Sequence, residues 1–96
     1  MNVSGFSTEQ ENFGKMVKLH RKERKLRLLD LEIITGIDDS TLSKIEKGKI
    51  NVELLTIFKL AKAFEITSHE LLDYSRIPLE TKTKSLKKAA AKNKKA

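Results

Sequence analysis

The residues of this chain that could carry chemistry are two histidines and a few carboxylates. The chain has no cysteine, so disulfides, thiolate metal sites and a thiol nucleophile are excluded, and His20 and His69 are its only imidazoles. We interpret His20 as a solvated surface residue, since no carboxylate adjacent in sequence would tune it, and His69, beside Glu70 in the first turn of a short helix, in the same way. Glu32, Asp38 and Asp39 could form a metal or acid–base cluster, but helix caps and surface charge explain them more simply. We therefore expect no catalytic residue, metal site or cofactor, and no enzymatic activity.

The positive charge of the chain is concentrated in two segments. The formal charge is +7, but residues 1–81 hold 13 basic and 13 acidic side chains, so residues 82–96, with seven lysines and no acid, carry the whole excess. Residues 15–27 are locally basic, with Glu23 as their single acid. Such a segment could follow a phosphate backbone or be an ordinary solvated helix face, and charge alone leaves both interpretations open. The lysine-rich segment either aids solubility or attracts DNA without sequence preference.

Helix signals divide the first part of the chain into two expected helices. Ser7, followed three residues later by Gln10, is typical of a capping box and predicts a helix over residues 8–24. Residues 26–35 contain no glycine or proline and are followed by Gly36, the residue best suited to a left-handed turn. A short second helix is expected there.

Three further helices are predicted after this turn. Asp38 or Asp39 can cap a short third helix, which ends at Gly48. Asn51 is expected to cap a fourth helix, whose apolar residues recur at spacings of three and four over residues 54–64.

The fifth expected helix follows a second capping box and ends the ordered part of the chain. Thr67 and Glu70 form this box, and Pro78 blocks a simple continuation of the helix. From residue 79 onward, lysine, threonine, serine and alanine dominate, which leaves little to bury. The expected organisation is a flexible arm over residues 1–7, one compact all-helical domain over 8–76, and a basic, disordered tail over 77–96.

Two short helices joined by a glycine turn meet the physical requirement for a helix-turn-helix, and a longer set of residues carries a more specific resemblance. These positions are Gly14, Val17, Arg21, Leu26, Leu31, Gly36, Ile37, Ser43, Ile45, Glu46, Gly48, Leu54, Leu60, Ala61, Ala63 and Leu71. At their spacing the chain resembles the lambda-repressor-like family, which includes Cro and the phage repressors, from Phe13 to Leu72. The resemblance implies a five-helix domain in which residues 26–35 brace the recognition helix, residues 39–47.

The resemblance also implies which residues meet DNA. Base edges in the major groove would be approached by Asp39, Ser40, Ser43 and Lys44. Lys44 is the best candidate, because a lysine can donate to guanine O6 and N7. The sugar-phosphate backbone would be contacted by Thr41, Lys47, Lys49 and Asn51 and by Arg27. A buried ion pair between Arg21 and Glu46 would join the first helix to the end of the recognition helix.

Several residues depart from the family pattern. Arg27 and Leu28 stand where the family usually has serine or threonine followed by a phosphate-holding glutamine; Arg27 can replace it as a charge, but Leu28 cannot. Glu32 stands where a small alanine is usual, so either the two helices cross less closely or the carboxylate leans out to solvent. Asp38 and Asp39 would repel phosphate, unless one caps the helix and the other accepts from cytosine N4.

We expect the chain to bind double-stranded DNA sequence-specifically as a small, repressor-like transcriptional regulator. A homodimer is expected, with its contact in the fifth helix and the segment after it, at Leu72, Tyr74, Ile77 and Leu79. The alternative is a protein-interaction module on the same fold, such as an antitoxin that binds a toxin, or a partner of an RNA polymerase component. No leader or long apolar run is present, so a cytoplasmic, nucleoid-associated protein without membrane contact is expected.

Overall fold

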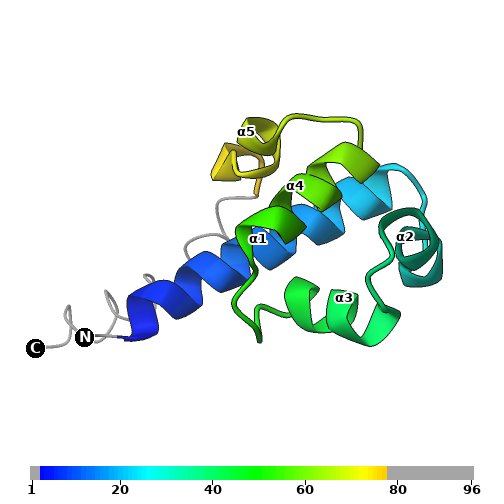
Figure 1. The fold of residues 1–96 in the computed structure, drawn as a ribbon. Helices are drawn as coiled ribbons and strands as arrows, with labels where there is room; N and C mark the ends of the chain where they lie inside the picture. Colours follow the sequence, from blue (N-terminus) through cyan, green and yellow to red (C-terminus); the bar gives the residue numbers. More distant parts are fainter. Residues whose placement is uncertain (1–2, 78–96) are drawn as a thin grey trace, which may run out of the picture.

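The fold is all-helical, as the sequence predicts. The computed structural model describes the backbone of residues 3–77 and the side chains of residues 8–77, so the lysine-rich segment and Leu79 lie outside the described residues. In chain order the elements are α1 (Val3–Glu23), α2 (Leu28–Thr35), α3 (Asp39–Glu46), α4 (Leu54–Ala63), α5 (Ser68–Leu71) and a short 3-10 helix, η1 (Tyr74–Arg76). The other helices gather around the C-terminal part of α1, while its N-terminal end projects from them (Figure 1). No helix of the described residues is long and apolar enough to cross a membrane.

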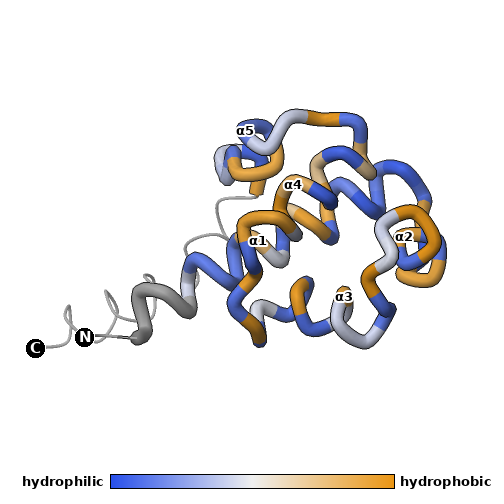
Figure 2. Tube along the Cα trace, viewed as in Figure 1, coloured by the Kyte–Doolittle hydropathy of each residue, from blue (hydrophilic) through white to orange (hydrophobic). Residues whose placement is uncertain are grey.

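One apolar core joins these helices. Hydrophobic and hydrophilic residues alternate along α1, α3 and α4, while α2 is apolar over most of its length (Figure 2). Each of the helices α1 to α5 buries at least one apolar residue in the core. The buried apolar residues are Phe13, Met16, Val17, Leu31, Leu42, Ile45, Leu60, Ala61, Phe64, Leu71 and Ile77. Burying a large apolar side chain contributes about 1.5 to 3 kcal/mol each, so this core holds α2 and α3 in a fixed arrangement.

The expected starts of α1 and α4 are wrong, α2 begins two residues later than expected, and the expected caps of α3 and α5 are confirmed. α1 begins at Val3, so Ser7 lies inside the helix, and the expected arm over residues 1–7 has helical backbone from Val3 onward. α4 begins after Glu53 instead of Asn51, because Val52 packs against the core and the chain stays extended up to Glu53. At α5 the expected cap is present, since the Thr67 side chain accepts the Glu70 N–H at 3.0 Å.

The prediction that His20 is a solvated residue is wrong. The side chain is buried, with 2% of the residue exposed, and its ring stacks on Phe64 at 5.6 Å between centroids. Arg24 closes the site by donating to the His20 and Phe64 carbonyl oxygens, at 2.9 and 3.1 Å. Burial and the nearby Arg24 charge lower the pKa of His20. The physical reason is its place on α1, three and four residues after the buried Val17 and Met16.

Candidate nucleic-acid interface

The turn between α2 and α3 is fixed by a left-handed glycine and by one threonine. Gly36 has a backbone φ of 77°, a left-handed conformation that residues other than glycine rarely adopt. The Thr35 hydroxyl donates to the Leu31 carbonyl at 2.7 Å and accepts the Ile37 N–H at 3.1 Å. The angle between the bracing and recognition helices is therefore set by local hydrogen bonds as well as by the core.

Glu32 links α2 directly to the start of α3. Its carboxylate accepts the backbone N–H of Asp39 at 3.0 Å, one of the free donors at the N-terminus of α3. The side chain therefore leans toward the first turn of α3. Glu32 thus caps the first turn of α3, which an alanine at this position could not do.

Asp38 caps α3 from the other side. Its carboxylate accepts the Thr41 N–H at 3.3 Å, the Thr41 hydroxyl at 2.7 Å and the Ser40 hydroxyl at 2.6 Å. These hydrogen bonds lower the pKa of Asp38 to about 2, and the largest contributions come from the hydroxyl groups of Ser40 and Thr41. Ser40 and Thr41, both expected at the DNA, therefore direct their hydroxyl protons to the cap. Asp39 is exposed, and its carboxylate has no hydrogen-bond partner among the described residues.

The C-terminal end of α3 is anchored on α1 by a buried ion pair. Arg21 Nε lies 2.6 Å from Glu46 Oε2 and Arg21 Nη2 lies 3.0 Å from Oε1, while only 9% and 7% of the two side chains are exposed. Arg21 also donates to the Leu26 carbonyl at 2.8 Å. The structure thus brings together the two residues for which the resemblance implies a pair.

Gly14 lets the backbones of α1 and α3 meet beside this pair. A Cβ at this position would lie 2.3 Å from the Ile45 carbonyl oxygen and 2.6 Å from that of Glu46. Any larger residue would push the helices apart at the point where the ion pair forms. The C-terminal end of α3 is therefore fixed by contact as well as by charge.

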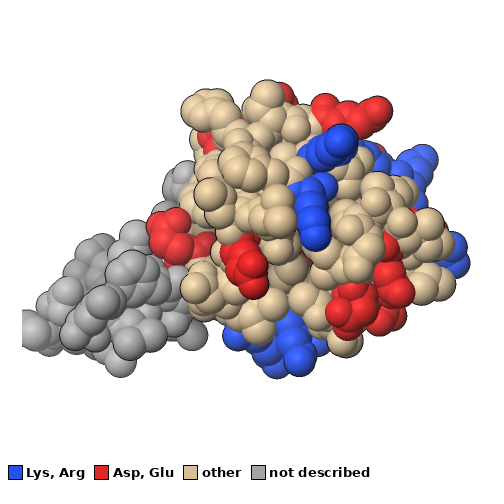
Figure 3. Space-filling model, viewed as in Figure 1, with Lys and Arg blue, Asp and Glu red and all other residues tan. Residues whose placement is uncertain are grey.

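The outward side of α3 is graded in charge from one end to the other. Lys44 is exposed in its last turn, Lys47 and Lys49 are exposed just after it, and Asn51 is exposed in the loop that follows. Ser43 is half-buried beside Lys44. In Figure 3 acidic side chains gather where α2 meets α3, and basic ones lie along the other end of α3. Attraction for phosphate is thus strongest at the C-terminal end.

Arg27 stands apart from the basic end of α3 and is paired locally. It precedes α2 and forms two side-chain hydrogen bonds with Asp30, at 3.1 and 2.9 Å, while its own backbone N–H donates to the same carboxylate at 2.8 Å. These bonds lower the pKa of Asp30 to about 2. The sequence interpretation missed Asp30, although its spacing of three residues from Arg27 is a helix-cap signal. A phosphate at Arg27 would compete with this pairing.

No metal centre emerges from this arrangement. Among the residues with described side chains, no group of three or more histidines, aspartates and glutamates is placed to hold a metal ion. Glu32, Asp38 and Asp39 sit close together, but two of them are hydrogen-bonded to the α3 backbone.

Comparison with protein sequences connects this arrangement to known regulators. A family model described as helix-turn-helix matches residues 17–71. The chain is 37% identical over 91 residues to the HTH-type transcriptional repressor RghR of Bacillus subtilis, covering 84% of this chain and 67% of that protein. It is 42% identical over 53 residues to the HTH-type transcriptional regulator DdrOP3 of Deinococcus deserti, covering 55% of this chain and 41% of that protein.

Solved structures give the same fold. The restriction-modification controller protein C.AhdI from Aeromonas hydrophila matches with a TM-score of 0.63 and 34% identity, over 65% of this chain and 94% of its own. The clp gene regulator ClgR from Corynebacterium glutamicum matches with a TM-score of 0.67 over 90% of this chain and 84% of its own, at 17% identity, which shows a shared fold alone.

Proposed function

The chain belongs to the lambda-repressor-like helix-turn-helix family of DNA-binding transcriptional regulators, and from this premise we propose that it represses transcription by placing α3 in the major groove of specific sites. The observation that carries this proposal is the graded outward side of α3, held at both ends by the rest of the domain. A recognition helix must keep its position while its side chains test base edges. Such a role would place the protein in the cytoplasm, at the nucleoid.

The basic end of α3 would meet the phosphates. Lys47, Lys49 and Asn51 follow the helix on exposed positions, so they can approach the backbone beside the groove. Arg27 would join them on exchanging Asp30 for a phosphate, and Thr41 would do so by turning its hydroxyl proton from Asp38 to a phosphate oxygen. These contacts would set the register of α3 on the duplex without reading its sequence.

Base readout would come from the two edges of the outward side. Asp39 is available to accept from cytosine N4 or adenine N6 because Asp38 provides the cap, and Lys44 can donate to guanine O6 and N7. With a rise of about 1.5 Å per residue the two lie about 7.5 Å apart along the helix axis. This distance is about two base-pair steps of 3.4 Å. Ser43 and Ser40 would add hydroxyl contacts between them.

A homodimer would place two copies of α3 in successive major grooves. The dimer surface expected from the sequence needs correction, because Ile77 is 3% exposed and packs into its own core, and Tyr74 is half-buried. Leu72 of the expected surface is exposed, and further exposed apolar side chains lie at Leu54, Leu55 and Phe58 on α4. We place the two-fold contact at Leu72 and at Leu54 and Leu55 in the first turn of α4, since a self-complementary apolar patch is what a closed dimer requires.

Paired alanine variants test the assigned roles. Lys44→Ala is expected to cost about 1 to 3 kcal/mol on a preferred duplex and little on random DNA. Lys47→Ala should weaken both duplexes equally and flatten the slope of log affinity against log salt by about 0.9. Fluorescence anisotropy titrations at several salt concentrations give both quantities, and each variant controls for the other. If Lys44→Ala weakens both duplexes equally, its base-reading role is refuted.

A further inference from the structure

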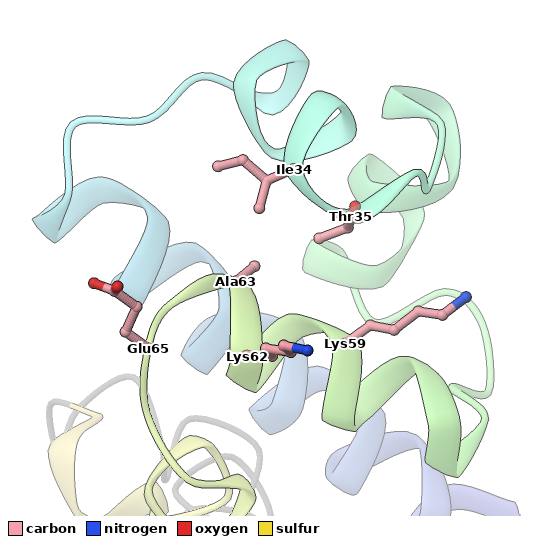
Figure 4. A pocket seen from close by; sticks show the side chains of 6 residues that line it. All are labelled: Ile34, Thr35, Lys59, Lys62, Ala63 and Glu65. Carbon is pink, nitrogen blue, oxygen red and sulfur yellow. The ribbon is translucent and has the colours of Figure 1, made fainter.

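A groove of about 480 Å³ lies between α2 and α4, outside the proposed DNA interface. Its lining residues are Ile34, Thr35, Lys59, Lys62, Ala63 and Glu65 (Figure 4). Ile34 and Glu32 lie about 200° apart around α2, at 3.6 residues per turn. Glu32 contacts α3, so Ile34 lies on the flank of α2 that faces away from the recognition helix, and Thr35 lines the groove at the end of α2.

The wall formed by α2 is apolar and unusually exposed. Ile34 is 53% exposed, and the adjacent Ile33 is 76% exposed. Thr35 offers no free proton to a ligand, because its hydroxyl already donates to the Leu31 carbonyl. Ile34 therefore offers the groove an apolar contact, and Ile33 extends the exposed apolar surface beside it.

The wall formed by α4 adds positive charge to this apolar surface. Lys59 and Lys62 are one helical turn apart and exposed, and neither has an ion-pair partner among the described side chains. In Figure 4 the carboxylate of Glu65 and the ammonium group of Lys59 lie at opposite ends of the groove, and the ammonium group of Lys62 lies between them. Basic side chains also lie over α4 in Figure 3. The groove therefore combines an apolar wall with two unpaired cations.

We propose that this α2–α4 groove docks a segment of another protein, which inserts an apolar side chain against Ile34 and pairs carboxylates with Lys59 and Lys62. An amphipathic helix with acidic residues three or four positions apart fits such a surface. The groove is open to solvent, whereas small-molecule pockets enclose most of their ligand. Phosphate of DNA would use the lysines but gains nothing from Ile33 and Ile34. None of the residues assigned to DNA lines the groove, so we expect the partner to bind the regulator on DNA.

Peptide selection tests the chemistry of the partner. Random 16-residue peptides displayed on phage would be selected on the full chain, and the enriched peptides synthesised and titrated by anisotropy. We expect enriched peptides to carry a leucine, isoleucine or phenylalanine close to two acidic residues. Ile34→Asp and the double variant Lys59→Glu/Lys62→Glu should each weaken binding at least tenfold. The matched control Lys18→Glu/Lys22→Glu, on exposed positions of α1, should leave binding unchanged.

A charge-swapped peptide sharpens the test. Replacing its acids by lysines should abolish binding to the parent chain and restore binding to Lys59→Glu/Lys62→Glu. Melting curves verify folding, and Ile34→Thr replaces Ile34→Asp if the latter melts early. The proposal is overturned if no peptides are enriched, if basic peptides are enriched, or if the variants bind like the parent. It is also overturned if Ile34→Asp abolishes self-association in sedimentation, because a second copy is then the occupant. A loss of DNA affinity in Lys59→Glu/Lys62→Glu, with none in Ile34→Asp, would overturn it as well.

Discussion

The two ends of α3 are both held by carboxylates, but in opposite surroundings. At the N-terminal end Asp38 and Glu32 accept backbone N–H groups on the exposed surface. At the C-terminal end Glu46 is bound by Arg21 in a largely buried pair, beside the backbone contact at Gly14. The first arrangement is local and open to water, whereas the second joins residues of two helices, Arg21 and Glu46, that are 25 positions apart in sequence.

This difference separates positioning from recognition. Breaking a buried pair leaves an uncompensated charge, so the C-terminal end fixes where α3 lies on the domain. The N-terminal end is negatively charged and would repel phosphate, so we expect it to favour bases that present hydrogen-bond donors. Attraction for DNA in general is left to the lysines at the other end.

The largest effect is expected from Glu46→Gln. This substitution strands the Arg21 guanidinium in a site where its side chain is 9% exposed, which should lower the free energy of unfolding by about 3 to 5 kcal/mol. The thermal midpoint should fall by more than about 10 °C in circular dichroism melts. As a comparison, Asp30→Asn removes a carboxylate from the exposed pair with Arg27 and should change the midpoint far less. Equal midpoints for Glu46→Gln and the parent would show that packing alone positions this end.

The smallest effect is expected at the N-terminal end, in acid. The pKa of Asp38 is about 2 in the folded chain, below its ordinary value of 3.8. A carboxyl group whose pKa is lowered by folding stabilises the fold at pH values above its pKa in the unfolded chain. This contribution is lost as the pH falls from 3.8 through about 2.

Asp38→Asn isolates this contribution, because asparagine caps a helix about as well as aspartate but does not titrate. In circular dichroism melts, the thermal midpoint of the parent should exceed that of Asp38→Asn at pH 5. The difference between the two midpoints should narrow as the pH approaches 2. A gap that stays constant over this range would mean that the charge of Asp38 does not contribute to the cap.

The features that the sequence predicted depend on spacing along the chain. The turn at Gly36 and the partnership of Arg21 with Glu46 follow from a pattern that the family repeats at fixed intervals. The cap at Asp38 or Asp39 follows from aspartates placed just before a helix. The exposure of Lys44 also follows, since it lies away from the buried Leu42 and Ile45 on a short helix.

The features that were missed depend on geometry between elements or on side-chain length. The hydrogen bond between Glu32 and Asp39 depends on the angle between α2 and α3, which the sequence does not specify. His20 was judged by its basic neighbours, although its spacing from Met16 and Val17 indicated the core. The groove at Ile34 could not be predicted, because the sequence of a short apolar helix does not show which of its apolar residues the neighbouring helices cover.

Selection of bound fragments from random duplex DNA tests the central claim most directly. If α3 reads bases in a two-fold dimer, the parent chain should enrich a palindrome whose half-sites are about one helical turn, or 10 to 10.5 base pairs, apart. Each half-site should contain a guanine about two base steps from a cytosine or adenine, matching Lys44 and Asp39. Fragments enriched without any shared sequence, or no enrichment over random DNA, would contradict sequence-specific recognition by α3.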